Sequence, residues 1–200
     1  MLRRITTALA ATLIAGTAFA DVATLVKDCE GCHGTNGASQ WTDMPTIAGI
    51  SKTVHADYLT AYQNKERPCT KSKFRQGDTK RPETDMCAVT AKLSEADIQG
   101  LAAHFAAKPF VAAKQAVDAA KATAGAAIHK KDCEKCHTEG GKVADDDASI
   151  LTGQQLGYLK KAMEEFNSGK RPQEKNMKKK MDALKPADLE ALANFYASGK

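Results

Sequence analysis

The sequence predicts an all-α protein made of two tandem copies of one small fold. Three observations support this: a five-residue motif occurs twice, the residues after each copy keep the same spacing, and apolar residues recur at helical intervals in both halves. The first copy of the motif spans Cys29–His33 and the second spans Cys133–His137, 104 residues later. No segment shows the apolar–polar alternation that marks a half-buried strand.

The internal repeat extends well beyond the motif. An offset of 104 residues still aligns Pro68 with Pro172, without a gap. After the prolines the offset falls to 91, which aligns Leu93 with Leu184 at the start of the last helix. The first half therefore carries a 13-residue insertion between Pro68 and that helix.

Three helices are expected in each half, over 22–33, 52–66 and 94–107 and then over 113–134, 154–168 and 186–198. The first helix of each half leads into the motif. The middle helix carries an apolar stripe, which in the first half is Val54, Leu59 and Tyr62. The last helix begins after the favourable N-cap Ser94 in one half and with Pro186, which suits a first turn, in the other.

The chain is expected to divide into three parts. Residues 1–20 combine a basic start at Arg3 and Arg4, an apolar run and the small-x-small sequence Ala18–Ala20, which is typical of a secretory signal peptide. The apolar run is too short to span a bilayer. We therefore expect an exported, soluble periplasmic protein with a first domain over 21–108 and a second over 109–200.

The repeated motif, Cys-x-x-Cys-His, is the attachment signature of a c-type haem. Cysteines three residues apart lie one helical turn apart, so Cys29 and Cys32 can bond the two vinyl groups of one porphyrin. The following His33 supplies an axial nitrogen to the iron, and Cys133, Cys136 and His137 repeat the arrangement. A zinc site or a thioredoxin-like pair is the rival interpretation. The pairs are 104 residues apart rather than about 15–20, and each carries the trailing histidine, so two covalent haem c groups are predicted.

Methionine sulfur is the ligand expected on the opposite side of each iron, because it suits a low-spin electron carrier. Met86 and Met177 each lie seven residues before the leucine that opens the last helix, so they occupy equivalent positions. A single methionine in an apolar region is usually core packing. The matched pair favours ligation by both, with Met44 and Met181 as the weaker candidates.

Three further histidines, His55, His104 and His129, align with apolar residues of the other half, so we interpret them as packed or half-exposed side chains. The two remaining cysteines, Cys69 and Cys87, bracket the insertion. In an oxidising compartment they are most simply a disulfide, which would close 17 residues and contribute about 3 kcal/mol. The alternative is Cys87 as an iron ligand, since it adjoins Met86.

The formal charge of +5 does not indicate a nucleic-acid partner. It falls to +3 without residues 1–20, and four haem propionates would bring it to about −1. A cluster of six basic residues and one acid nevertheless lies between Lys170 and Lys180, around Met177. It is either an ordinary solvated face or a patch that steers an acidic redox partner. The acidic run Asp145–Asp147 is interpreted as a surface loop.

The tandem pattern over 21–200 resembles the di-haem class I cytochromes c, which comprise the cytochrome c4 family and the cytochrome subunit of flavocytochrome c sulfide dehydrogenase. The resemblance rests on both motifs, on Pro45–Gly49, on the methionine spacing and on the closing aromatic helix. It implies that the Pro45 carbonyl orients His33, although Ser149 replaces this proline in the second half. The insertion departs from the family pattern.

The second half is more similar to the sulfide dehydrogenase subunit, through its motif and the segments Gly140–Lys142, Ile150–Gln154, Arg171–Pro172 and Phe195–Ser198. That resemblance implies a flavoprotein partner, carrying FAD, which oxidises sulfide and passes single electrons to the haems. The acceptor would be a soluble cytochrome or an oxidase.

The alternative is a free-standing cytochrome c4-type carrier that feeds a terminal oxidase. A third interpretation, an enzyme such as a di-haem peroxidase or a thiosulfate dehydrogenase, would need an open, histidine or cysteine sixth position. We identify no catalytic residues in the sequence.

Overall fold

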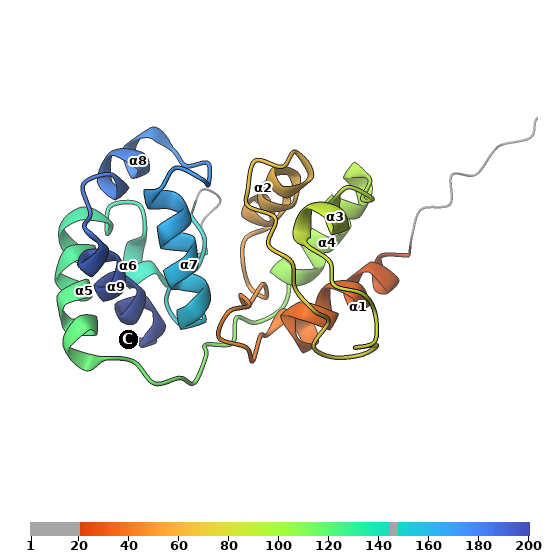
Figure 1. The fold of residues 1–200 in the computed structure, drawn as a ribbon, viewed down its shortest axis with the longest axis horizontal. Helices are drawn as coiled ribbons and strands as arrows, with labels where there is room; N and C mark the ends of the chain where they lie inside the picture. Colours follow the sequence, from red (N-terminus) through yellow and green to blue (C-terminus); the bar gives the residue numbers. More distant parts are fainter. Residues whose placement is uncertain (1–20, 145–147) are drawn as a thin grey trace, which may run out of the picture.

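A computed structural model describes residues 21–144 and 148–200, and Figure 1 shows two groups of helices joined by an extended segment. The first group holds α1 (Val22–His33), η1 (Thr35–Gly37), α2 (Lys52–Gln63), α3 (Met86–Thr90) and α4 (Glu95–Ala106). The second holds α5 (Ala119–Asp132), α6 (Thr138–Gly141), α7 (Leu156–Asn167), α8 (Lys175–Met181) and α9 (Pro186–Ala197). Within these residues β-pairing is limited to one isolated bridge, Ser72 with Thr84, so the all-α prediction is confirmed.

Two of the sequence-based interpretations fall on parts of the chain that the structure does not describe. These are the signal peptide over 1–20 and the acidic run at 145–147. Among the described residues, no helix combines the length and the apolarity needed to cross a membrane.

All six predicted helices form, with some shifted ends. The α2 helix ends at Gln63 rather than at 66, because Lys65 adopts the left-handed conformation with φ of 59°. The α5 helix begins at Ala119 rather than at 113, because the Asp118 side chain caps it by accepting from the amides of Ala120 and Lys121. The residues before it are held extended, with the Ala113 amide donating to the Gly153 carbonyl at 2.8 Å.

The short helices that were not predicted include α3 and α8. They have five and seven residues and begin at the acidic N-caps Asp85 and Glu174. Helices this short do not repeat an apolar position often enough to give a periodic signal. Their placement matters because they contain Met86 and Met177.

The first and last helices of each half cross at close range. A Cβ atom added at Gly100 of α4 would lie 2.8 Å from Cγ2 of Val22 in α1. The equivalent crossing of α5 and α9 is tighter, since a Cβ at Gly125 would lie 2.1 Å from the carbonyl oxygen of Ala191. Each half has its own apolar core beside this crossing, built around Phe105 in the first and Leu192 in the second.

Two buried glutamines join the halves. The Gln154 side chain accepts from the Thr46 amide at 3.0 Å and donates to the Thr46 carbonyl at 2.5 Å. The side-chain Nε2 of Gln155 donates to the Ser39 carbonyl at 2.7 Å. Gln154 is only 2% exposed, so the two halves meet at a buried, hydrogen-bonded contact that fixes their relative placement.

Candidate haem-binding site

The first motif lies in the last turn of α1. Cys29 and Cys32 are free thiols, and His33 is the final residue of the helix. The side chain of Asp21 starts this helix by accepting from the Ala23 amide. The motif therefore has the helical geometry that the spacing predicted, with both cysteines and the histidine lining one cavity.

Burial and one hydrogen bond suit His33 to the predicted role of iron ligand. It is 7% exposed, and its Nδ1 lies 3.0 Å from the Pro45 carbonyl oxygen. Because a carbonyl can only accept, Nδ1 carries the proton and Nε2 keeps its lone pair for a metal. Burial lowers the pKa of His33 to about 4, so the ring is neutral, which is the ligating form.

The second motif follows a different local course. The α5 helix ends at Asp132, and Cys133 to His137 form turns in which the His137 amide donates to the Cys133 carbonyl at 3.0 Å. The prediction of a helix through residue 134 was wrong, because the Glu134 amide bonds the His129 carbonyl five residues back instead of continuing the helical ladder. Cys136 is exposed, whereas its counterpart Cys32 is half-buried.

One continuous cavity of about 2130 Å³ is lined by both motifs and runs between the halves. Its lining includes Met86 and Met177 together with apolar side chains such as Leu59, Leu101 and Leu192. A large apolar cavity with thiols and an imidazole at its wall fits a covalently attached porphyrin. Met44, Met163 and Met181 also line it, so the choice of Met86 and Met177 as ligands stays a prediction.

Two equivalent arginines add positive charge to this cavity. Arg67 and Arg171 are 5% and 3% exposed, and neither forms an ion pair with any carboxylate in the described part of the chain. They stack instead on aromatic rings, Arg67 over Tyr62 at 4.2 Å and Arg171 over Phe166 at 4.3 Å. The buried Nε of Arg67 has no hydrogen-bond partner. Buried cations are normally paired, so these two fit an anionic group in the cavity, such as haem propionates.

The remaining histidines are placed as interpreted. His55 and His129 are buried, and each has its own polar partners: His55 Nε2 lies 2.6 Å from the Ile47 carbonyl oxygen, and His129 contacts Tyr196 and Glu134. His104 is half-buried against the edge of Phe105. Only His55 of these three lines the cavity.

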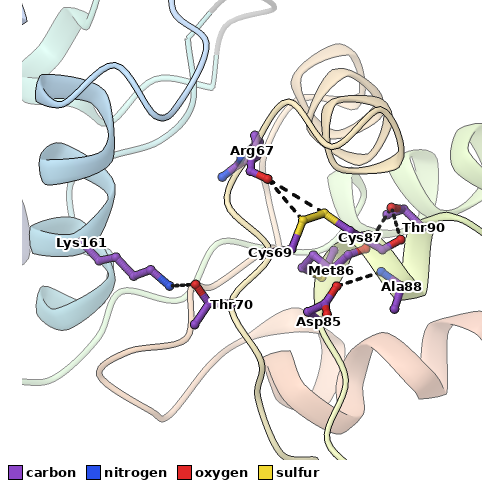
Figure 2. Close-up of a disulfide and its surroundings, with 9 residues drawn as sticks. All are labelled: Arg67, Cys69, Thr70, Asp85, Met86, Cys87, Ala88, Thr90 and Lys161. Atoms are coloured by element: carbon purple, nitrogen blue, oxygen red, sulfur yellow. Dashed lines mark hydrogen bonds between the residues drawn. A yellow bond between two sulfur atoms is a disulfide. The ribbon is translucent and has the colours of Figure 1, made fainter.

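Cys69 and Cys87 are joined by a disulfide, with their Cα atoms 5.6 Å apart. Figure 2 shows the bond beside Met86 and the N-cap Asp85, with the Arg67 carbonyl oxygen 3.4 Å from the sulfur of Cys69. The bond closes the base of the insertion next to the segment that carries Met86.

The insertion contains residues that the sequence did not single out. Phe74 is buried against the first motif, and the amide of Arg75 donates to the Gly31 carbonyl at 2.7 Å. No pattern in the sequence marks these contacts, because the insertion has no counterpart in the second half. The buried Arg67 and Arg171, by contrast, occupy equivalent positions of the sequence repeat, each directly before the aligned proline.

Comparison with known proteins agrees with a haem site at each motif. The cytochrome c family model matches residues 19–106 and 122–200. Among solved structures, cytochrome c4 from Acidithiobacillus ferrooxidans aligns with a TM-score of 0.71 at 24% identity, covering 86% of this chain and 99% of that one. Cytochrome c4 from Pseudomonas stutzeri aligns with a TM-score of 0.69 at 22% identity, covering 88% and 97%.

A third solved structure, the thiosulfate dehydrogenase TsdBA from Marichromatium purpuratum, aligns with a TM-score of 0.69 at 22% identity, covering 88% of this chain and 39% of that one. None of the curated proteins compared matches the chain. Each half thus carries one family domain with its own attachment motif, so the protein holds two covalently bound haem c groups and transfers electrons. The chain belongs to the cytochrome c family.

Proposed function

We propose that this di-haem cytochrome works in the periplasm as the one-electron acceptor of a flavoprotein that oxidises sulfide. The observation that carries the electron-transfer part is the single cavity on which both motifs open. Two redox groups in one cavity can exchange electrons without an intervening layer of protein. The similarity of the second half to sulfide dehydrogenase cytochrome subunits supports the choice of donor.

The residues of the chain divide the work at each site. A bound haem supplies one-electron iron chemistry. Cys29, Cys32, Cys133 and Cys136 hold the group in place, and His33 and His137 present a ring nitrogen to the metal. In this proposal Met86 and Met177 would each supply a thioether sulfur to the iron, which would disfavour substrate binding and raise the potential.

A free-standing carrier is the second candidate. It is supported by the two cytochrome c4 structures, whose chains are covered almost completely, over 99% and 97% of their lengths. In this case the acceptor would be a terminal oxidase, and no flavoprotein would stay bound.

Purification from the native host separates the two candidates. The sulfide-oxidising proposal predicts that a tagged chain, beginning at Asp21 in the periplasmic fraction, brings down an FAD-containing protein and that added sulfide reduces both haems. A clean monomer or dimer that a terminal oxidase rapidly oxidises would support the second candidate instead. Rapid binding of carbon monoxide to a reduced haem would contradict both, because it requires an open iron position.

A further inference from the structure

The two haem sites differ in what covers the edge that carries the cysteines. In the first domain, the insertion between Cys69 and Cys87 folds back as a hairpin, which we call the strap. The disulfide closes its base, and paired backbone hydrogen bonds of 2.7 and 3.0 Å between Ser72 and Thr84 hold its two arms together. The second domain has no equivalent segment, because the insertion is absent there.

The strap lies directly on the first attachment motif. The amides of Arg75 and Gln76 both donate to the Gly31 carbonyl, at 2.7 and 3.2 Å. The carbonyl oxygen of Lys73 lies 3.7 Å from the sulfur of Cys32. A Cβ atom at Gly31 would lie only 2.8 Å from Cδ1 of Phe74, so the ring occupies the space that a side chain would take. The motif and the strap therefore fit each other only with glycine at position 31.

Ion pairs tie the strap down and neutralise its two arginines. Arg75 makes a two-pronged contact with Asp43, at 2.7 and 2.6 Å, and Arg81 bonds Asp28 at 2.6 Å. Arg81 also lies over the ring of Phe74 at 4.0 Å. The strap covers the first motif, and its five basic side chains are matched by its three acidic ones together with Asp28 and Asp43. Its exposed Lys71 and Lys80 form no ion pair with any residue that the structure describes.

The corresponding surface of the second domain is open and basic. The residue equivalent to Gly31 is the exposed Lys135, and Cys136 is exposed beside it. Five exposed lysines, which we call the basic rim, line the cavity in the second domain: Lys130, Lys131, Lys135, Lys179 and Lys180.

Most of the rim's charge is available to a partner. Lys180 and Lys131 share Asp132, at 2.7 and 3.9 Å. Lys130, Lys135 and Lys179 form no ion pair with any residue that the structure describes. Over the full sequence the asymmetry persists: residues 21–108 hold eleven basic and eleven acidic side chains, whereas 109–200 hold sixteen and thirteen.

We infer that electrons pass to an acidic redox protein through the basic rim of the second domain, while the strap closes the first domain to such partners. A porphyrin attached to the exposed Cys136 would have that edge near the surface, and the unpaired lysines around this cysteine would attract and orient a negatively charged protein. Over the first motif, the Phe74 ring blocks access to the cysteine-bearing edge, and the basic and acidic side chains around it balance. This inference rests on the proposed electron-carrier function.

Oxidation of the fully reduced holoprotein by ferricyanide tests the rim. This small trianion takes one electron and becomes ferrocyanide as one iron(II) becomes iron(III), so it stands in for an acidic partner. At low ionic strength, reversing three lysines together (Lys130→Glu, Lys135→Glu and Lys179→Glu) should slow the reaction at least about tenfold relative to a control with the same net charge. The control reverses the exposed lysines Lys27, Lys52 and Lys114, which lie outside the cavity lining.

The difference should shrink as salt is added, and a cationic oxidant, tris(phenanthroline)cobalt(III), should react faster with the rim variant. Equal rates for the rim variant and the control would overturn the inference. A binding readout accompanies the kinetics: the redox-inert trianion hexacyanochromate(III) should broaden NMR signals of rim residues and not those of the strap. Broadening centred on the strap would contradict the inference.

The strap is tested in the rim-reversed background. Gly31→Gln displaces Phe74 without adding charge, and Lys135 shows that the motif accepts a side chain at this position. It should open a second route and raise the ferricyanide rate about threefold or more, and Phe74→Ala should do the same by removing the covering ring. If both variants keep two haems and neither changes the rate, the strap is not a cover. A wild-type protein without two methionine-ligated haems would instead refute the proposed function, so the two failures are distinguishable.

Discussion

At the scale of single residues, the two predicted histidine ligands differ in their surroundings. His33 is buried and oriented by the Pro45 carbonyl oxygen at 3.0 Å. His137 is half-buried and follows a turn, and Ser149 stands where the first half has its proline. Since the access of solvent to an iron centre tunes its potential, we expect the two haems to differ in potential.

Replacing the predicted sulfur ligands should affect one site at a time. Met86→Ala and Met177→Ala are each expected to lower one of the two potentials, by an appreciable part of the roughly 0.8 V that axial ligands span, because the thioether favours iron(II). Spectroelectrochemical titration measures this. Met44 also lines the cavity, so Met44→Ala is the matched control and should leave both potentials nearly unchanged. A larger effect from Met44 than from Met86 would reverse the assignment.

The contact between Arg75 and Asp43 should give the strap a defined pH dependence. The Arg75 guanidinium lowers the pKa of Asp43 from its ordinary value of 3.8 by hydrogen bonding, with burial opposing. A lowered folded-state pKa means that the contribution to stability is complete above about pH 4 and is lost as the pH falls through the folded-state pKa. Because Asp43 is largely exposed, the contribution should be under about 1 kcal/mol.

Denaturant unfolding of Asp43→Asn and of the wild type, from pH 7 down to pH 2, measures the contribution of the Arg75–Asp43 contact to the free energy of unfolding. The stability difference should be constant to about pH 4 and vanish below. Asp57→Asn, an exposed carboxylate on α2, should show no such difference. If the stability difference between Asp43→Asn and wild type grew as the pH fell, the pKa of Asp43 would not be lowered in the folded state.

At the scale of the helices, most of the fold could be predicted, because amphipathic periodicity, caps and the repeat all act over a few residues. α1, α4 and α9 begin and end within about one residue of the prediction. α3 and α8 could not be found, since one or two turns show no period. The early end of α5 depends on a bond between the Glu134 amide and the His129 carbonyl, which competes with the helix and leaves no mark in the composition.

The close crossing of α5 and α9 makes Gly125 the most constrained of these positions. In Gly125→Ala the new methyl group would meet the Ala191 carbonyl at 2.1 Å, so the helices must separate. We expect a loss of about 1–3 kcal/mol in the free energy of unfolding, typical of overpacking, measured by denaturant titration of the holoprotein. Ala127→Ser, on the exposed side of the same helix, is the control and should cost under about 0.5 kcal/mol. Equal losses in both would show that the helices do not touch here.

At the scale of the whole molecule, the interface between the domains decides how the two sites work together. The sequence predicted two similar domains but none of their mutual contacts, because those contacts join residues far apart in the sequence, such as Thr46 and Gln154. The motif residues could be predicted because covalent attachment fixes their spacing locally. The strap contacts and the unpaired charge of the buried arginines depend on tertiary packing, which one sequence does not reveal.

Gln154 should couple the folding of the two domains. Gln154→Ala removes both hydrogen bonds to Thr46 and leaves a buried amide and carbonyl without partners, at a cost of about 1–3 kcal/mol each. Calorimetry of the holoprotein should then show two separated transitions in place of one. Gln40→Ala, at an exposed position, should leave the single transition intact. A single transition in Gln154→Ala would mean that the domains are coupled by other contacts.

The far-red absorption of the oxidised protein tests the central claim most directly, that each of two covalent haems is held by histidine and by methionine sulfur. The account predicts a methionine-to-iron charge-transfer band with the intensity of two haems per chain, falling to half in Met86→Ala and in Met177→Ala. A wild-type spectrum without the band, or with one haem's intensity, would contradict it.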